Sequence, residues 1–377
     1  MNDKIWLSSP HMGGNEIKYV TDAFDTNWIA PLGPNVDNFE LELGKFNNVN
    51  HVAALSSGTA AIHLALILSN VKRDDEVLCQ SMTFSASANP IIYQGASPIF
   101  IDSERETWNM DPNLLREAII SKIRINKKPK AMIVVHLYGM PSQMDDIMSI
   151  SKEFEIPVIE DAAEAIGSKF HGQYCGTFGD LGIYSFNGNK IITTSGGGAL
   201  VSTNKEKIDK ARFLATQARD SAPHYEHSEI GYNYKMSNIS AGIGRGQLEV
   251  LKDRIQQRRA NYDFYEKHLG DIEGLSFHKE PDEYFSNRWL TTLLIDPKIT
   301  GGIGREDIRL SLLKENIEAR PLWKPMHLQP IFRNSQQFLN GVSDELFRDG
   351  LCLPSGSNLT LAEKNKVVQS IKSVLKS

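Results

Sequence analysis

The feature that most constrains the fold of this chain is a series of short apolar runs with helical patterns between the first four. Continuous apolar runs of strand length that alternate with helices are typical of buried strands in an α/β sheet. The pattern therefore predicts an α/β fold. The expected strands are Glu76–Cys79, Pro98–Ile101, Ala131–Leu137, Pro157–Ile159, Gly182–Phe186 and Ala199–Ser202, with helices over 85–94, 112–123 and 144–155.

The rest of the chain predicts further helices and a second, smaller α/β unit. The chain has 377 residues, and at roughly 150 residues per domain this length predicts about two domains. We expect a large domain over 1–250 and a small domain over 251–377. Further helices are expected over 14–27, around Val36–Phe46, after Ser56, over 238–269 as one long helix, over Arg305–Asn316 and over Leu361–Leu375, with a strand at Trp289–Ile295.

Composition argues against several classes of protein. The 41 Lys and Arg residues against 46 Asp and Glu give a net charge of -5, which disfavours a dedicated nucleic-acid binder. Cys79, Cys175 and Cys352 lack the spacing of a zinc site or a disulfide framework, so we expect a reducing compartment and no metal. No apolar run approaches the ~20 residues that span a bilayer, and Met1 to Pro10 lacks the apolar core of a signal peptide. A cytoplasmic protein is expected.

Ser56-Ser57-Gly58-Thr59 opens one of the expected helices. A helix N-terminus offers free N–H groups and the positive end of the helix dipole, and glycine lets an anion approach the backbone. The segment is therefore a candidate phosphate site. A plain Ser or Thr N-cap explains the same residues and, for this segment alone, is the commoner case.

Asp161 and Lys190 each follow an expected buried strand. The carboxyl ends of strands are where ligands gather in open α/β sheets. Lys190 ends a polar loop that starts at Ser185, and three glycines follow at 196–198. Taken singly, Asp161 is explained as a loop cap and Lys190 as a solvated lysine, because most lysines are exposed. A catalytic role for Lys190 requires a buried site.

Two later segments combine aromatic and polar side chains. Gly231-Tyr232-Asn233-Tyr234 alone is explained as a turn with two packing aromatics. The segment Arg320–His327 places three side chains that can carry positive charge around a tryptophan, which suits a diphosphate and a stacked ring. A surface loop interrupted by prolines explains this second segment about equally well.

Together these segments describe one chemistry. Pyridoxal 5'-phosphate (PLP) requires a lysine for its Schiff base, a carboxylate at its pyridinium nitrogen and a phosphate cup at a helix N-terminus. The chain offers Lys190, Asp161 and the Ser56–Thr59 segment for these three tasks, on loops of one predicted sheet. The sequence therefore predicts a PLP site.

The sequence resembles the DegT/DnrJ family of PLP-dependent nucleotide-sugar aminotransferases over nearly its whole length. This resemblance rests on Ser57–Ala61, Glu160–Ala163, Ser185-Phe186 with Lys190, and Gly231–Tyr234. Further segments are similar to the bacillosamine-pathway enzymes, which aminate C4 of a UDP-4-keto-6-deoxy-N-acetylhexosamine. They are Pro10–Gly14, Trp28–Gly33, Asn187–Ser195 and Arg320–His327.

The resemblance implies a fold-type I enzyme, with a mostly parallel seven-stranded sheet in the large domain and a smaller C-terminal α/β domain. It implies a homodimer with shared active sites that takes a nucleotide sugar and L-glutamate. Lys190 is then the Schiff-base residue, and Asp161 pairs with the pyridinium nitrogen. The other implied cofactor contacts are Gly58, Thr59 and Ser185 at the phosphate, Asn233 at the phosphate of the neighbouring subunit, Phe84 on the ring, and Glu164 near the 3-hydroxyl. The implied substrate contacts are Asn27, Trp28, Ile29, Ala30, Arg320, Trp323, Lys324 and His327.

Two positions depart from the common family pattern. Asn187 stands where many members carry His, and Ser195 precedes the glycines where many carry an acidic residue. Both departures resemble the bacillosamine group, so we expect transfer of an amino group from glutamate to C4 of the keto-sugar. Two alternatives stay open: amination of another nucleotide-linked 3- or 4-keto-sugar, and a non-catalytic regulatory protein of the same fold.

Overall fold

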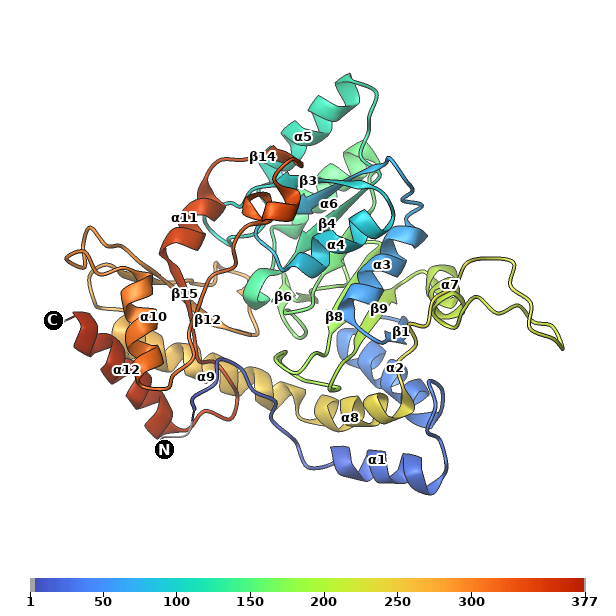
Figure 1. The fold of residues 1–377 in the computed structure, drawn as a ribbon, viewed down its shortest axis with the longest axis horizontal. Coiled ribbons are helices and arrows are strands. Elements are labelled where there is room, and N and C mark those ends of the chain that lie inside the picture. The colour runs from blue at the N-terminus through green and yellow to red at the C-terminus, as the bar shows by residue number, and fades with distance from the viewer. Residues whose placement is uncertain (1–3, 376–377) are drawn as a thin grey trace.

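The computed structural model describes residues 4–375, and an eight-stranded sheet lies at its centre (Figure 1). The strand order is β1-β9-β8-β5-β4-β2-β3-β14, and β9 is antiparallel to both of its neighbours. The predicted α/β fold with a mostly parallel sheet is confirmed. The bounds are β1 His51–Leu55, β2 Glu76–Gln80, β3 Ser97–Ile101, β4 Ala131–Val135, β5 Val158–Asp161, β8 Leu181–Ser185, β9 Gly198–Ser202 and β14 Gln336–Phe338.

Helices cover both faces of this sheet, which explains why its central strands are continuously apolar. In β2, Val77 and Cys79 face one apolar core and Leu78 faces another. The helices α3 (Gly58–Leu68), α4 (Ser85–Tyr93) and α7 (Lys205–Ala215) pack on the first face. The opposite face is covered by α2 (Pro34–Asn47), α5 (Pro112–Arg124) and α6 (Met144–Phe154).

The predicted count of seven strands is wrong by one. The additional strand, β14, comes from the C-terminal part of the chain and pairs in parallel with β3, so that Gln336 lies opposite Ile99. Two of its three residues are glutamines, so β14 carries no apolar pattern of its own. Its position is therefore set by long-range pairing at the edge of the sheet.

A second sheet is built from the C-terminal part of the chain. Its antiparallel strands lie in the order β10-β12-β15-β13, and its core includes Tyr265, Leu312 and Val367. The elements are β10 Leu275–Phe277, β12 Thr291–Ile295, β13 Arg320–Pro321, β15 Gly350–Leu353, α9 Leu251–Leu269, α10 Arg305–Lys314 and α12 Leu361–Leu375. The domain limits 1–250 and 251–377 stay a prediction.

The expected single helix over 238–269 is wrong, because two helices occupy this stretch. α8 (Asn238–Glu249) and α9 meet at Val250, whose φ of -106° and ψ of 4° interrupt the helical path. The Val250 side chain lies against the N-terminal segment, where a Cβ on Gly13 would be 3.0 Å away. A tertiary contact therefore coincides with the break in a pattern that is otherwise helical.

The remaining elements lie outside these two sheets. α1 (Glu16–Asp25) packs against α8, and the chain before it forms a bridge between Ile5 and Ile317 beside the smaller sheet. Within residues 4–375, no helix has the length and apolar character required to cross a membrane. The last elements are α11 (Val342–Asp349) and a three-stranded sheet of β6 (Lys169–Phe170), β7 (Gln173–Tyr174) and β11 (Tyr284–Phe285).

Candidate active site

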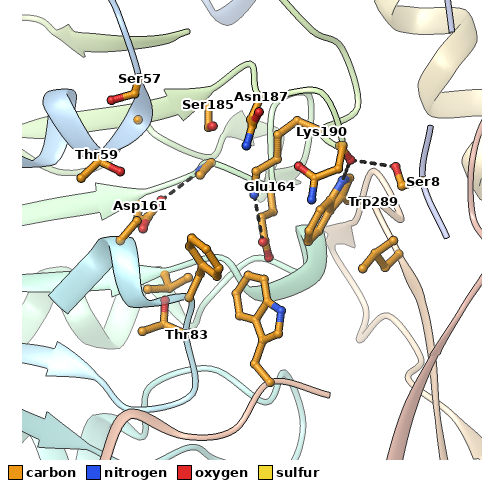
Figure 2. Close-up of a pocket in the computed structure, with 18 of the residues that line it drawn as sticks. Ser8, Ser57, Thr59, Thr83, Asp161, Glu164, Ser185, Asn187, Lys190 and Trp289 are labelled. Carbon is orange, nitrogen blue, oxygen red and sulfur yellow. Dashed lines mark hydrogen bonds and ion pairs between the residues drawn. The ribbon is translucent and has the colours of Figure 1, made fainter. Parts of the chain in front are cut away.

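A cavity of about 770 Å³ lies at the carboxyl-terminal edge of the large sheet, where open α/β sheets bind ligands. Figure 2 shows Ser57, Thr59 and Asp161 on one side and Lys190 and Trp289 on the other. The cavity gathers many of the residues predicted from the sequence. They are Gly58, Thr59, Phe84, Asp161, Glu164, Ser185, Lys190, Arg320, Trp323 and Lys324.

The first turn of α3 forms one end of the cavity. The Ser57 hydroxyl caps the helix by accepting an N–H from its first turn at 3.0 Å. The N–H groups of Gly58 and Thr59 begin the helix and have no partner inside it. The neighbouring backbone is close: a Cβ on Gly198 would lie 2.4 Å from the Gly58 nitrogen, and a Cβ on Gly58 would lie 3.1 Å from the Cβ of Ser185. The segment is thus both an N-cap and an open site for an anion.

Asp161 is the last residue of β5 and is 5% exposed. Its Oδ2 accepts the Ser87 hydroxyl at 2.6 Å, and its Oδ1 accepts the Ala163 N–H at 3.1 Å. The Ser87 hydroxyl lies 2.7 Å from that of Thr83. This network fixes the carboxylate at the cavity wall, which is more than a loop cap requires.

Lys190 extends its Nζ into the cavity and contacts Glu164 Oε1 at 3.1 Å (Figure 2). The same Nζ lies 4.3 Å from the centre of the Trp289 ring. Both side chains of the ion pair are largely buried, at 12% exposed for Lys190 and 3% for Glu164. Burial raises the pKa of the Glu164 carboxyl to about 7, although the Lys190 ammonium acts in the opposite direction. Glu164 Oε2 also accepts the Tyr138 N–H at 2.8 Å.

Aromatic and cationic side chains form the wall that comes from the C-terminal part of the chain. The Trp323 ring lies 5.5 Å from that of Phe84 and 5.2 Å from that of Tyr138. Arg320 is exposed and donates twice to Glu318 Oε1, at 2.8 and 3.0 Å. The wall can therefore stack a ring and meet an anionic group.

Six predicted site residues do not line this cavity. Both ring nitrogens of His327 are engaged, with Ser81 Oγ at 2.7 Å and Asp344 Oδ1 at 3.1 Å, so this histidine is buried in a structural network. Asn233 is exposed in the segment between α7 and α8, where it forms an isolated bridge with Thr216. The others, Asn27, Trp28, Ile29 and Ala30, follow α1, where the side chain and backbone N–H of Asn238 hold the Trp28 and Ala30 carbonyls.

Sequence reasoning missed several residues of the site. Leu7, Ser8, Thr83, Trp289 and Leu290 all line the cavity. Thr83 precedes Phe84 and lies three residues after the end of β2, so its position near a strand end was an available signal. The others reach the site from opposite ends of the chain, and no local pattern marks them.

The cavity fits PLP. The glycines beside the first turn of α3 leave room that a Cβ would fill, and that turn offers N–H groups to a phosphate. A buried lysine and a fixed carboxylate face the same space from opposite sides. These are the donors that the cofactor requires.

Comparisons with known proteins support a PLP-dependent enzyme. Residues 10–372 match the model of the DegT/DnrJ/EryC1/StrS aminotransferase family. EpsN of Bacillus subtilis, assigned as a pyridoxal phosphate-dependent aminotransferase, is 53% identical over 373 residues, which cover 98% of this chain and 95% of EpsN. GDP-perosamine synthase of Escherichia coli O157:H7 is 37% identical, with 97% of each chain covered.

Solved structures of sugar aminotransferases superpose closely on this fold. Aminotransferase TlmJ from Streptoalloteichus hindustanus gives a TM-score of 0.91 at 26% identity over 99% of each chain. The PLP form of Spr1654 from Streptococcus pneumoniae, assigned as a sugar aminotransferase, gives 0.88 at 26% identity, also over 99% of each chain. This chain therefore belongs to the DegT/DnrJ/EryC1/StrS aminotransferase family and is a PLP-dependent sugar aminotransferase.

Proposed function

We propose that the protein transfers the amino group of L-glutamate to C4 of a UDP-4-keto-6-deoxy-N-acetylhexosamine, giving a UDP-4-amino-4,6-dideoxy-N-acetylhexosamine for bacterial glycan synthesis. The observation that carries the proposal is one cavity on which Lys190, Asp161 and the first turn of α3 all open. Its far wall holds Arg320 and Trp323, which suit the diphosphate and base of a nucleotide sugar. The choice of UDP rests on the sequence segments similar to the bacillosamine-pathway enzymes.

In this proposal the large sheet supplies the cofactor contacts. The N–H groups of Gly58 and Thr59, with the Ser185 hydroxyl, hold the phosphate, and the Asp161 carboxylate keeps the pyridinium nitrogen protonated. Phe84 packs on the ring. When bound, the cofactor supplies an electron sink for the electron pair left on the reacting carbon.

Lys190 has two tasks, which both fall to its Nζ. It would hold the cofactor, and as a free amine it would take the proton from the donor carbon of glutamate and, as its conjugate acid, deliver a proton to C4 of the sugar. Glu164, 3.1 Å away, orients this amine. Because the Lys190 side chain is only 12% exposed, bulk water has little access to the proton in transit.

We further propose that the active unit is a homodimer in which Asn233 reaches the partner's cofactor phosphate and Asn27–Ala30 reach the partner's substrate. Both segments lie outside the cavity of their own chain, as residues that serve a partner's site must. Large apolar side chains beside the second segment are exposed, at 62% for Phe24 and 55% for Leu32. Clustered exposed apolar groups are typical of interaction surfaces.

A GDP-linked keto-sugar is the second candidate substrate, favoured by the match to GDP-perosamine synthase. The test is a panel of UDP-, GDP- and dTDP-linked 4-keto and 3-keto sugars, each incubated with PLP-loaded enzyme and glutamate. Mass spectrometry should find the amino sugar fastest from the UDP-linked 4-keto-6-deoxy-N-acetylhexosamine. Preferential amination of a GDP-linked sugar would replace the proposed substrate and leave the reaction class intact.

The same experiment addresses the regulatory alternative. An active enzyme is yellow, and borohydride should leave the cofactor covalently attached to Lys190, which peptide mass spectrometry locates. A colourless protein that turns over no sugar of the panel would favour the non-catalytic alternative.

A further inference from the structure

The Lys190 loop depends on other segments for its shape. It joins β8 to β9 without regular structure and contains glycines at 188, 196 and 197. The Lys190 N–H donates to the Asn187 carbonyl at 3.0 Å, within the loop. The carbonyls of Asn189 and Lys190 receive hydrogen bonds from distant parts of the chain. A catalytic group must be held within ~0.5 Å of its productive position, so these outside contacts affect where the Lys190 Nζ lies.

Three side chains contact these two carbonyls, while Gln247 of α8 accepts the Thr193 N–H further along the loop at 3.2 Å. Ser8 Oγ donates to the Asn189 carbonyl at 2.7 Å, and Trp289 Nε1 donates to the same oxygen at 2.8 Å. Arg258 Nη2 lies 3.5 Å from the Lys190 carbonyl. They come from the N-terminal segment, from the residues before β12 and from α9. Trp289 also places its ring 4.3 Å from Lys190 Nζ, so it contacts both the backbone and the amine of this loop.

The three side chains are also joined to one another. Arg258 Nη1 donates to the Trp289 carbonyl at 2.5 Å, and Nη2 donates to Ser8 Oγ at 3.0 Å. The Ser8 hydroxyl therefore accepts from Arg258 and donates to Asn189. Loss of one member leaves the others with an unmatched polar atom.

The buried position of Arg258 is energetically unfavourable. Its side chain is fully buried, and no ion pair found within residues 4–375 includes it. Burial lowers the pKa of its guanidinium to about 9, and the nearby Arg254 adds to this effect. A buried charge without a counter-charge destabilises the folded protein. The Arg258 guanidinium contacts the Lys190 carbonyl, Ser8 and the Trp289 carbonyl, and these contacts explain why a charged side chain occupies this buried position.

We propose that Ser8, Arg258 and Trp289 form a brace that positions the Nζ of Lys190 in the cavity. All three are positioning residues, and Trp289 in addition covers the amine with its ring. The inference rests on the proposed role of Lys190. It extends the active site to the N-terminal segment, which holds the lysine loop although it lies more than 180 residues away in sequence.

The test uses single substitutions that each remove one hydrogen bond to the Asn189 carbonyl; Ser8→Ala also removes the acceptor of Arg258 Nη2. Ser8→Ala removes the hydroxyl, and Trp289→Phe removes Nε1 but keeps an aromatic ring. Ser8→Thr retains a hydroxyl and should restore the contact. Ser9→Ala is the matched control, because the Ser9 hydroxyl bonds to Asn358 at the surface and does not line the cavity.

The first readout is hydrogen–deuterium exchange of the peptide covering 187–198 in cofactor-free protein, which does not depend on activity. A hydrogen bond to the loop contributes about 1 kcal/mol, so Ser8→Ala and Trp289→Phe should each exchange these amides about fivefold faster, and the double variant that combines the two roughly 25-fold faster. Peptides from β4 should exchange at the wild-type rate. Ser8→Thr and Ser9→Ala should match the wild type throughout.

The second readout is steady-state kinetics of the loaded enzyme. A displaced amine slows the chemical step, so kcat should fall about fivefold in each single variant while KM for both substrates changes less than about twofold. Three results would each overturn the proposed brace. They are wild-type exchange at 187–198 in both single variants, an effect of Ser9→Ala as large as theirs, and faster exchange with an unchanged kcat. If the double variant does not fold, the single variants decide. Borohydride trapping on another lysine would instead overturn the role of Lys190, which the exchange data do not test.

Discussion

The predicted site residues fall into two parts, which lie in different places in the folded chain. Lys190, Asp161, Ser185 and the first turn of α3 lie around one cavity, on the loops of one sheet. Asn233 and the segment Asn27–Ala30 lie away from it, and the latter lies beside exposed apolar side chains. The first part is assembled by the folding of a single chain. The second part, in our proposal, reaches a site only when two chains associate.

This difference separates two kinds of defect. A change in the first part should damage the cavity of its own chain, and no partner can supply the lost group. A change in the second part should damage the cavity of the other chain. The predictions below test this division, from the largest expected effect to the smallest.

Lys190→Ala should abolish turnover, because no other side chain then provides the attached amine and the proton-transferring base. Loss of the general base alone contributes about 10²- to 10⁴-fold, and loss of attachment adds to it. The measurement is turnover together with borohydride trapping. The matched control is Lys324→Ala, which removes another lysine of the same cavity and should retain the covalent cofactor. Turnover at the wild-type rate in Lys190→Ala, with the cofactor still trapped, would move the attachment elsewhere.

Asp161→Asn should lower kcat by roughly 10²- to 10³-fold, the usual cost of removing one preorganised electrostatic partner. The amide can still accept the Ser87 hydroxyl, so the local structure should survive. Absorbance titration with PLP should show that the variant still binds cofactor through its phosphate contacts. A rate within a few-fold of wild type would reduce Asp161 to a loop cap.

The part of the site that one chain assembles is also the part that sequence predicted best. Asp161 and Ser185 end strands whose apolar runs are plain, and Lys190 follows in a polar loop, so local pattern and strand order place all three at one sheet edge. Trp289 and Ser8 escaped prediction because each contacts the Lys190 loop across 100 or more residues.

The strands that the sequence did not predict also depend on long-range contacts or lack a clear local pattern. The glutamines of β14 become a strand only through pairing with β3, and β1 contains two alanines that fit a helix as well as a strand. Conversely, the family resemblance and the cationic side chains of Arg320–His327 predicted a substrate contact for His327, yet its bonds to Ser81 and Asp344 are internal. A local pattern identifies which residues are polar and leaves open which group they bind.

A mixed dimer tests the second part directly. Lys190→Ala and Asn233→Glu should each be impaired alone, since one lacks the amine and the other sets a negative charge at the partner's phosphate. In a heterodimer both lesions fall in one site and the other site is intact. Co-refolding equal amounts should therefore recover up to about one quarter of wild-type activity, if subunits pair at random.

Two controls make the mixed-dimer result decisive. Asn233→Glu alone should bind PLP more weakly, because a hydrogen bond to a charged phosphate oxygen contributes roughly 1.5–3 kcal/mol, or about 10- to 150-fold in affinity. Native mass spectrometry establishes that the heterodimer forms. A heterodimer without recovered activity would place Asn233 at its own site or at none.

The smallest effect concerns the stability of the first part without cofactor. Burial raises the Glu164 pKa to about 7 from an ordinary value of 4.5, so the folded chain binds this proton more tightly than the unfolded chain. The stability that the protonated form contributes is therefore present below pH 4.5 and is lost as the pH rises through about 7. The difference amounts to ~3 kcal/mol at most. Glu164→Gln cannot ionise, so its stability relative to wild type should increase between pH 5 and pH 8.

Urea unfolding of the cofactor-free proteins at several pH values measures this difference. Glu164→Gln keeps an acceptor for the Tyr138 N–H but loses its charge opposite Lys190. Its absolute stability therefore differs from that of the wild type, and the slope of stability with pH is the quantity to compare. Glu153→Gln, a half-exposed residue of α6 paired with Arg116, is the control for removal of a carboxyl far from the cavity. If the free energies of unfolding of wild type and Glu164→Gln change with pH in parallel, ionisation of Glu164 does not destabilise the folded protein. If the stability of Glu164→Gln changes less with pH than that of the wild type, the Glu164 carboxyl lowers the stability of the folded protein when it ionises. Such a cost is expected for a side chain whose role is to orient the Lys190 amine.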